Sequence, residues 1–270
     1  MEKRISVLMG IYNCAATLPE AIDCILAQTV EDWELILCDD GSADDTYAVA
    51  KIYAEKYPER IILLKNEKNM GLNYTLNRCL SAAKGEFVAR MDGDDLCSPD
   101  RFQKELAVLQ EHPELAVVST AMTYFDETGT WGRSQPKIHP EKGDFLYGTP
   151  FCHAPCMARR AAFEAVGGYT DDPKFLRVED YDLWVKLYAA GYRGMNLDEA
   201  LYQMRDDRNA FSRRKFRYRI NEARVICKAV GLLKLPKSGY IRAMRPILVG
   251  LMPMWLYKKL HKKRLGSENG

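Results

Sequence analysis

Residues 87–101 read FVARMDGDDLCSPDR, an apolar run of strand length that passes directly into three carboxylates, Asp92, Asp94 and Asp95. Like charges this close repel one another, and they favour protonation or disorder unless a cation or a bound ligand compensates them. The stretch therefore predicts a strand whose end forms a site for a positively charged group.

Similar apolar runs occur before and after this stretch, and the segments between them mostly have helical periodicity. A sequence that alternates strands and helices in this way builds a mostly parallel sheet covered by helices on both faces. We therefore predict an α/β, Rossmann-like fold in which residues 1–120 form a nucleotide-binding half. The expected strands are Ile5–Met9, Trp33–Cys38, Arg60–Leu64, Glu86–Met91 and Ala116–Thr120.

A helix is expected after each of the first four strands. The first begins at Thr17-Leu-Pro-Glu20, where threonine and glutamate three residues apart match a capping box and the proline falls in the first turn. The second follows the segment DDGSADD, the third covers about residues 73–84, and the fourth opens at Ser98-Pro99.

Polar clusters follow three of these strands, at 10–13, 39–42 and 92–95. In such sheets, ligands bind outside the carboxyl ends of the strands. Tyr12 can stack on a base, Asp40 can accept a base N–H, and an Asp-x-Asp loop can hold a divalent cation that also binds a diphosphate. Alone, Tyr12 could be a core aromatic and the segment DDGS an ordinary Asx turn. Their coincidence predicts a nucleotide site.

Four segments, ISVLMGIYN, LCDDGSADDT, GEFVARMDGDD and VEDYDLW, occur in an order and at separations typical of one enzyme family. Together they resemble the family 2 glycosyltransferases, over about residues 3–208. The resemblance implies a GT-A fold, a nucleotide-sugar donor and an inverting reaction.

The resemblance also implies roles for individual residues. Tyr12 and Asp40 match the family's contacts to the uracil of a UDP-sugar. Asp92 and Asp94 match the Asp-x-Asp pair, which binds the ribose and a Mn or Mg ion on the diphosphate. Asp180 matches the aspartate that acts as the general base in inverting members.

A general base is needed because the attacking hydroxyl of the acceptor must lose its proton. Glu179 and Asp180 begin a helical stretch, so Asp180 can point into the cleft from the first turn, and Glu179 is expected on the acceptor or phosphate side. Acidic neighbours on either side should raise the basicity of Asp180 by like-charge repulsion. Taken alone, such a pair would be explained as acidic residues that complement a helix N-terminus.

Two further candidates belong to the acceptor half. His153, in the segment FCHAPCM ahead of the expected base, is a candidate contact to the donor phosphate or the acceptor, with a structural role as the alternative. Many family members place another histidine at the diphosphate, but no histidine occurs here between His153 and His261. Arg205 or Arg208 is the expected replacement, because arginine suits bidentate phosphate contacts. A surface ion pair with the adjacent aspartates is the alternative.

Charge is divided unevenly along the chain, although the formal net charge is only +2. Residues 1–204 carry 21 Lys and Arg against 33 Asp and Glu, whereas residues 205–264 carry 18 against 3. This division indicates that the basic segment faces an anionic surface. The resemblance implies a glycosyltransferase domain at 1–208, with its acceptor half at 121–208, and the charge division predicts a basic helical extension at 209–270.

The extension contains an apolar run, Ile247–Tyr257, between clusters of positive charge. The run is shorter than the roughly 20 residues needed to span a bilayer as a helix, and Pro246 and Pro253 break any long continuous helix there. Its tryptophan and tyrosine are residues that settle at the level of lipid headgroups. We predict that residues 240–264 lie on an anionic membrane surface, close to a lipid-linked acceptor; packing on the protein's own body or a dimer contact is the alternative.

The eight cysteines are scattered and include no CxxC pair, so we expect neither a zinc site nor a disulfide framework. The N-terminus MEKRISVLMG lacks a signal-peptide core. Both features predict a cytoplasmic protein. The predicted membrane contact of residues 240–264 makes it peripheral on the inner face of the cell membrane. No nucleic-acid partner is expected, and no oligomeric state is predicted.

The predicted function is an inverting, metal-dependent glycosyltransferase that uses a nucleotide sugar, a UDP-hexose, with a saccharide or lipid-linked acceptor in surface polysaccharide synthesis. One alternative is a nucleotidyltransferase, which would need a Gly-rich loop with a basic residue after the first strand; GIYNCAATLPE offers neither. Another is a non-catalytic sugar-nucleotide-binding module, which leaves the Glu-Asp pair without a purpose. The sequence does not specify the donor sugar, the acceptor or the linkage.

Overall fold

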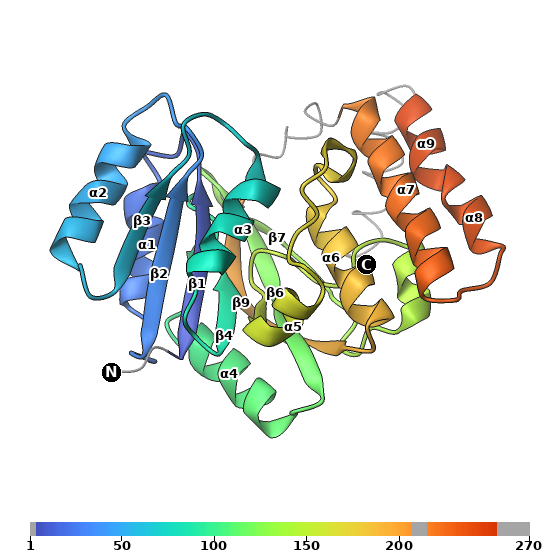
Figure 1. The fold of residues 1–270 in the computed structure, drawn as a ribbon, viewed down its shortest axis with the longest axis horizontal. Coiled ribbons are helices and arrows are strands. Elements are labelled where there is room, and N and C mark those ends of the chain that lie inside the picture. The colour runs from blue at the N-terminus through green and yellow to red at the C-terminus, as the bar shows by residue number, and fades with distance from the viewer. Residues whose placement is uncertain (1–3, 207–214, 253–270) are drawn as a thin grey trace.

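The computed structural model describes residues 4–206 and 215–252 (Figure 1). Within these residues the strands form one nine-stranded sheet in the order β3-β2-β1-β4-β8-β6-β9-β5, with β7 paired to β6. The strands are β1 (Ile5–Ile11), β2 (Trp33–Asp39), β3 (Ile61–Lys65), β4 (Phe87–Arg90), β5 (Leu96–Cys97), β6 (Leu115–Asp126), β7 (Gly129–Arg133), β8 (Met157–Arg159) and β9 (Arg193–Arg205). The helices are α1 (Leu18–Leu26), α2 (Thr46–Lys56), α3 (Leu72–Ala82), α4 (Arg101–Glu111), α5 (Arg160–Ala165), α6 (Glu179–Ala189), α7 (Phe216–Leu232), α8 (Gly239–Arg242) and α9 (Met244–Leu251).

The N-terminal half of the sheet is parallel, as predicted. β1 lies between β2 and β4, and β3 extends the sheet beyond β2. The first four predicted strands are confirmed within two residues at each end. Alternate residues of β1 and β2 pack against α3 on one face and against α1, α2 and α4 on the other, which is why both strands are apolar along almost their whole length.

The strand register brings the predicted polar clusters together. β1 and β2 pair so that Ile11 lies beside Asp39, and Tyr12 and Asp40 therefore follow at neighbouring strand ends. β4 lies on the other side of β1, with Leu8 opposite the last residue of β4. The loop after β4, which carries the three carboxylates, consequently opens at the same edge of the sheet.

The second half of the sheet is mixed, which differs from the predicted mostly parallel order. β8 runs antiparallel to both β4 and β6, whereas β6 and β9 are parallel to each other. β7 returns along β6 through a tight turn at Gly129, whose φ of +111° favours glycine. A strand that returns through a turn needs no crossover helix and can pair antiparallel.

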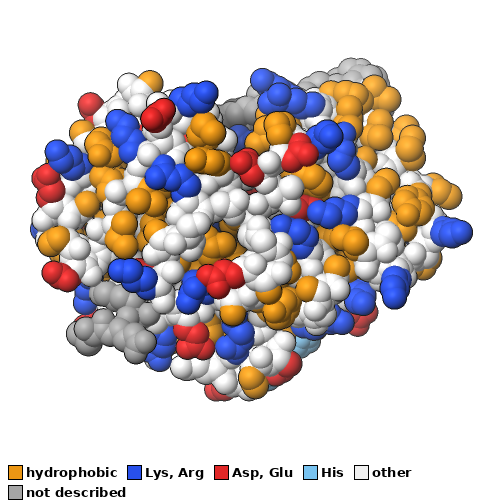
Figure 2. All heavy atoms as spheres, viewed as in Figure 1, with side chains coloured by type: hydrophobic (Ala, Val, Ile, Leu, Met, Phe, Trp, Pro, Cys, Tyr) orange, Lys and Arg blue, Asp and Glu red, His pale blue; other side chains and the backbone are white. Residues whose placement is uncertain are grey.

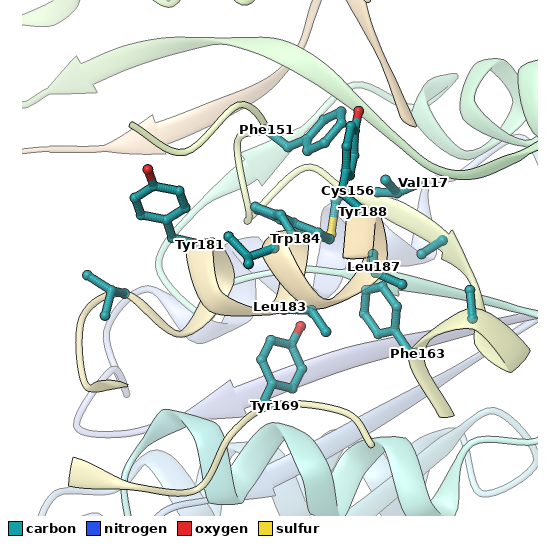
Figure 3. Packing of buried hydrophobic residues seen from close by; sticks show 14 of the residues in the cluster. Val117, Phe151, Cys156, Phe163, Tyr169, Tyr181, Leu183, Trp184, Leu187 and Tyr188 are labelled. Carbon is teal, nitrogen blue, oxygen red and sulfur yellow. The ribbon is translucent and has the colours of Figure 1, made fainter. Parts of the chain in front are cut away.

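The core of this half is built around α6. Figure 3 shows Trp184, on α6, among aromatic neighbours from several elements. Its indole meets Phe151 nearly edge to face, with ring centroids 5.5 Å apart, and Phe163 lies at 6.1 Å. Leu183 and Leu187, on the same helix, are also buried. This packing fixes α6 and hence the residues of its first turn.

The predicted capping box at Thr17 is not formed. The Thr17 hydroxyl donates to the carbonyl oxygens of Cys14 (3.2 Å) and Gly93 (3.0 Å) instead of accepting a bond from the helix. The bond to Gly93 ties the start of α1 to the acidic loop. Tertiary contact with that loop therefore replaces the local cap.

The C-terminal helices pack on the body through one face. α7 lies against α6, and α9 lies against α7 (Figure 1). Pro246 is buried, and Ile247 packs on the core of the second half. The opposite face carries an outer stripe of exposed apolar side chains, which gather at this edge of the molecule (Figure 2). The outer stripe consists of Ile241, Met244, Leu248 and Leu251.

Part of the predicted membrane segment, residues 253–264, lies outside the described residues, as does the predicted domain boundary at residue 208. None of the helices in 4–206 and 215–252 has the length and hydrophobicity needed to cross a bilayer.

Gly194→Ala is expected to lower the free energy of unfolding by about 1–3 kcal/mol, the usual cost of overpacking. A Cβ at Gly194 would lie 2.4 Å from Cγ1 of Val117 and 2.6 Å from the ring of Phe151, so β9 would have to move away from β6. Gly143→Ala is the matched control, because no atom lies within 4 Å of a Cβ built there. Urea unfolding of both variants tests this, and equal midpoints would contradict it.

Candidate functional site

The carboxyl ends of β1 and β2 form a wall of a cavity of about 370 Å³. Both Tyr12 and Asp40 line this cavity. Tyr12 is 48% exposed to solvent, whereas Asp40 is buried, with 5% exposed. An exposed aromatic ring beside a buried carboxylate can stack on a base while the carboxylate accepts a base N–H. The structure therefore brings the two predicted base contacts together.

Asp40 also organises the loop that closes this cavity. Its Oδ1 accepts hydrogen bonds from Nδ2 of Asn66 (2.7 Å) and the N–H of Met70 (2.8 Å), and its Oδ2 accepts one from the N–H of Gly71 (2.9 Å). Each carboxylate oxygen can accept about two hydrogen bonds. Oδ2 therefore retains the capacity for one further donor.

The three carboxylates after β4 have different partners. Asp92 forms an ion pair with Arg90, with 2.6 Å between Oδ1 and Nη2. Asp95 is hydrogen-bonded to the Tyr202 hydroxyl (2.9 Å) and to a backbone N–H (2.7 Å). Burial, reinforced by the neighbouring carboxylates, raises the pKa of Asp95 to about 8, so its neutral form dominates at pH 7. Asp92 is thus compensated by an ion pair and Asp95 by protonation. Asp94 is the carboxylate of this loop that remains to be compensated by the predicted cation.

Asp94 is exposed and lines a hollow together with Tyr12, Asp92 and Arg205. Partial enclosure, reinforced by the charge of Asp92, raises the pKa of Asp94, so a nearby cation would stabilise its ionised form. Mg²⁺ is commonly bound by one or two carboxylates together with substrate phosphates. Asp92 and Asp94 therefore fit an ion that arrives with a diphosphate. In the described part of the chain, no three side chains of His, Cys, Asp or Glu form a metal site by themselves.

Asp180 lies in the first turn of α6 and lines a hollow of about 910 Å³ that Asp92 also lines. The Thr149 hydroxyl donates to its Oδ2 at 3.4 Å. Burial raises the pKa of Asp180, so the predicted direction is confirmed, but desolvation rather than repulsion is the main cause. Asp182 faces away from the hollow, because it is buried against the ammonium group of Lys228.

Glu179 is a buried acid between the nucleotide cavity and the hollow of Asp180, and it lines both. Its Oε2 has no hydrogen-bond partner within the described residues. Burial, followed by the charge of Asp180, raises the pKa of Glu179 to about 7. A buried carboxyl oxygen without a partner is suited to a ligand hydroxyl, which agrees with the predicted position of Glu179 on the acceptor or phosphate side.

His153 lines the same hollow, but its ring is held by protein groups. Its Nε2 lies 2.8 Å from the Tyr169 hydroxyl, and its ring meets Trp184 edge to face. Burial, followed by the charge of Arg90, lowers the pKa of His153 well below its usual value. The ring is therefore neutral at pH 7, which favours the structural alternative over a cationic phosphate contact.

Arg205 lies beside the acidic loop, as predicted for a residue near the diphosphate. Its Nε donates to the carbonyl oxygen of Asp94 (3.0 Å), and its guanidinium pairs with Glu20 of α1 (2.8 Å) and covers the ring of Phe125. Among the described residues an ion-pair partner is thus on α1, whereas Asp207, part of the predicted alternative, lies outside them. Arg208, the other candidate, lies outside the described residues.

Two residues at this site were not predicted. Arg177 is exposed, has a φ of +65° that is rare for a side-chain-bearing residue, and lines three adjoining hollows. Tyr218, on α7, lines the nucleotide cavity with Tyr12. The only signal for Arg177 was its position three residues before Asp180. No pattern in the sequence indicated that α7 returns to the donor side.

Residues 6–167 match the family model described as "Glycosyl transferase family 2". EpsE of Bacillus subtilis (strain 168), which is named as a glycosyltransferase, is 46% identical over 266 residues, covering 98% of this chain and 95% of EpsE. WfaP of Escherichia coli, named as a UDP-Glc:α-D-GlcNAc-diphosphoundecaprenol β-1,3-glucosyltransferase, is 26% identical over 234 residues, covering 84% of this chain and 87% of WfaP.

Two solved structures share the fold. TarS 1–349 of S. aureus in complex with UDP-GlcNAc has a TM-score of 0.69 and 20% identity, covering 90% of this chain and 70% of that chain. The mannosyltransferase PcManGT of Pyrobaculum calidifontis, in complex with GDP-Man and Mn²⁺, has a TM-score of 0.68 and 18% identity, covering 98% of this chain and 80% of that chain. The predicted GT-A-type α/β fold is thereby confirmed.

Proposed function

The chain belongs to glycosyl transferase family 2, and from this premise we propose that it transfers a hexose, with inversion, from a UDP-hexose to the hydroxyl of a lipid-linked or polysaccharide acceptor. The observation that carries the proposal is that Asp180 and Asp92 line one hollow. A base with a raised pKa thus faces the residue expected at the donor ribose and diphosphate, across a space that can hold a sugar. The names of WfaP and of the TarS complex, which specify UDP-sugars, support the choice of UDP.

In the proposed reaction, the acceptor hydroxyl attacks the anomeric carbon from the side opposite the diphosphate. Its proton passes to a carboxylate oxygen of Asp180, which Thr149 orients, while the bond between the anomeric carbon and the diphosphate oxygen breaks. Tyr12 and Asp40 hold the uracil, and Asp92 holds the ribose. Attack and departure on opposite faces give inversion.

We further propose that Asp92 and Asp94 hold a Mn or Mg ion on the donor diphosphate. Such an ion would neutralise the charge that develops on the departing diphosphate. The exposed carboxylate of Asp94, whose pKa is raised by partial enclosure and by the charge of Asp92, supports this assignment, as does the Mn²⁺ named in the PcManGT complex. Arg205, whose guanidinium lies against the acidic loop, is proposed as a second positive group at the diphosphate.

Sugar transfer is expected to lose rate as the pH falls, at a higher pH than an unperturbed aspartate would give. The base must be ionised, and burial raises the pKa of Asp180, so the acidic limb of kcat/KM should lie above about 3.9. Because burial and the charge of Asp180 raise the pKa of Glu179 to about 7, Glu179 is still neutral where Asp180 titrates, so Glu179→Gln should leave this limb in place. Initial rates across pH test this, and a limb at the pH of an unperturbed aspartate, or one that moves in the variant, would contradict it.

We propose that the protein lies peripherally on the cytoplasmic face of a membrane that contains anionic lipid. The outer stripe supplies apolar side chains, and the extension around it is rich in lysine and arginine. This position would bring the cleft near a lipid-linked acceptor, such as the one in the name of WfaP.

Leu248→Glu is expected to weaken binding to phosphatidylglycerol vesicles by about tenfold or more, because an inserted leucine contributes at least about 1.5 kcal/mol. Ile52→Glu, at a similarly exposed position on α2, is the matched control and should leave binding unchanged. Co-sedimentation of the full-length proteins measures both. Equal loss in the two variants, or no binding by the unmodified chain at low salt, would overturn the membrane proposal.

Incubation with UDP-, GDP- and dTDP-sugars and Mn²⁺ tests the function itself. Slow release of UDP from a UDP-hexose is expected, because transferases pass the sugar to water when no acceptor is present. Release of pyrophosphate from UTP and a sugar phosphate would instead identify a nucleotidyltransferase. Binding of UDP-sugars without any turnover would favour a non-catalytic module.

A further inference from the structure

A second hollow, of about 720 Å³, adjoins Asp180 on the side of α7. Asp180 and Thr149 line both this hollow and the one shared with Asp92, so the carboxylate of Asp180 stands at the boundary between them. The residues expected to hold the donor, among them Tyr12 and Asp40, do not line the second hollow. A general base must contact the acceptor, and this hollow offers the acceptor an approach that the donor leaves open.

Two arginines line this second hollow. Arg177 makes no ion pair in the part of the chain that the structure describes, and its strained backbone holds it at the junction with the donor cavity. Arg219 pairs with Glu222 through Nη1 (3.0 Å), which leaves most of its five N–H donors available. The acidic lining groups are Asp180, Glu222 and Asp206.

The outer stripe ends beside this hollow. A Cβ built on Gly250 would lie 2.9 Å from the ring of Phe216 and 3.0 Å from Cγ of Arg219, so the end of α9 lies directly on the start of α7. Phe216, which is exposed, therefore lies beside the arginine that lines the hollow, and the exposed Leu251 follows Gly250 in the chain. An apolar surface, a guanidinium and the expected base follow one another along this side of the protein.

We propose that the second hollow binds the acceptor as a lipid diphosphate, with Arg177 and Arg219 contacting the phosphates and the outer stripe contacting the hydrocarbon chain. This inference rests on the proposed function. Guanidinium groups match phosphate oxygens in a bidentate geometry, whereas a neutral saccharide acceptor would need neither the arginines nor the apolar stripe. The sugar attached to the diphosphate would then extend toward Asp180.

Farnesyl diphosphate is a suitable probe, because it carries the diphosphate and a short isoprenoid chain without a sugar. It is titrated calorimetrically into the full-length protein with saturating UDP and Mn²⁺, which occupy the donor site. We expect binding that weakens at least tenfold in Arg177→Gln and in Arg219→Gln. Arg224→Gln is the matched control, since Arg224 lies on α7 but outside the hollow and bonds to Asn221 and a backbone carbonyl; its affinity should stay within twofold.

Absence of binding, equal affinity in all four proteins, or equal affinity for farnesol and farnesyl diphosphate would overturn the proposal. Arg177 is exposed, so its variant is expected to fold even where Arg219→Gln, which breaks a partly buried pair, does not. UDP binding and UDP-hexose hydrolysis should be unchanged in Arg224→Gln, because Arg224 lines neither the nucleotide cavity nor the second hollow. If the unmodified protein did not bind UDP, the proposed function would be contradicted. The effect of the arginine substitutions on farnesyl diphosphate binding would still test the proposed acceptor site.

Discussion

Asp180→Asn is expected to lower the rate of sugar transfer by about 100- to 10,000-fold, the range supplied by a general base. Asparagine has the size and shape of aspartate, so the Thr149 contact and the start of α6 should persist, but an amide cannot take the acceptor's proton. Because Asp180 is not among the residues that line the nucleotide cavity, the affinity for UDP should change little. Calorimetry with UDP and initial-rate measurements with an acceptor separate the two effects.

If Asp180→Asn transferred sugar at a near-normal rate, Glu179 would be the remaining candidate for the base, because Asp182 is buried in an ion pair with Lys228. A matched loss of UDP affinity would instead indicate that the substitution disturbs the cleft. Asp198→Asn, at an exposed position on β9, controls for the general effect of removing a carboxylate and should retain full activity.

Asp94→Ala is expected to abolish the metal dependence of UDP-sugar binding and to lower transfer by roughly 1,000-fold, the equivalent of about 4 kcal/mol of charge stabilisation. Asp94 is exposed, and its side chain is not part of the core, so the melting temperature should stay close to that of the unmodified protein. Titration of UDP with and without Mn²⁺ tests the binding, and thermal unfolding tests the fold.

Asp95→Asn is the matched control from the same loop. Asp95 is buried and is held by Tyr202 and a backbone N–H, and its raised pKa means that asparagine resembles its dominant neutral form. This variant should therefore keep its response to Mn²⁺. Full activity of Asp94→Ala, or undiminished turnover in EDTA, would remove the metal from the proposed mechanism.

The parallel half of the fold could be predicted because β1 and β2, at its centre, are buried on both faces and read as almost continuous apolar runs. Once β1 and β2 are placed, Tyr12 and Asp40 must follow at neighbouring strand ends, so their proximity needed no further information. The mixed half could not be predicted in this way. β8 has only three residues, and its antiparallel position depends on β4 and β6, which are far from it in sequence.

The sequence also could not tell which of three adjacent carboxylates would be neutralised by the protein. That outcome depends on Arg90, which is buried behind the loop, and on Tyr202, which arrives from β9. Arg177 and Tyr218 were missed for a related reason. Their places in the cleft follow from the packing of α7 against α6, a contact that leaves no periodic pattern near either residue.

One consequence of α7 concerns how such enzymes can be re-engineered. Tyr218 reaches the nucleotide cavity, and the next residue along the helix, Arg219, lines the hollow on the far side of Asp180. A chimera that exchanged the C-terminal helices to alter acceptor preference would therefore also replace a wall of the donor pocket. One turn of α7 thus contributes to both the donor cavity and the proposed acceptor hollow. Donor and acceptor preference would therefore have to be changed together, whether by exchanging segments or by selection from a library.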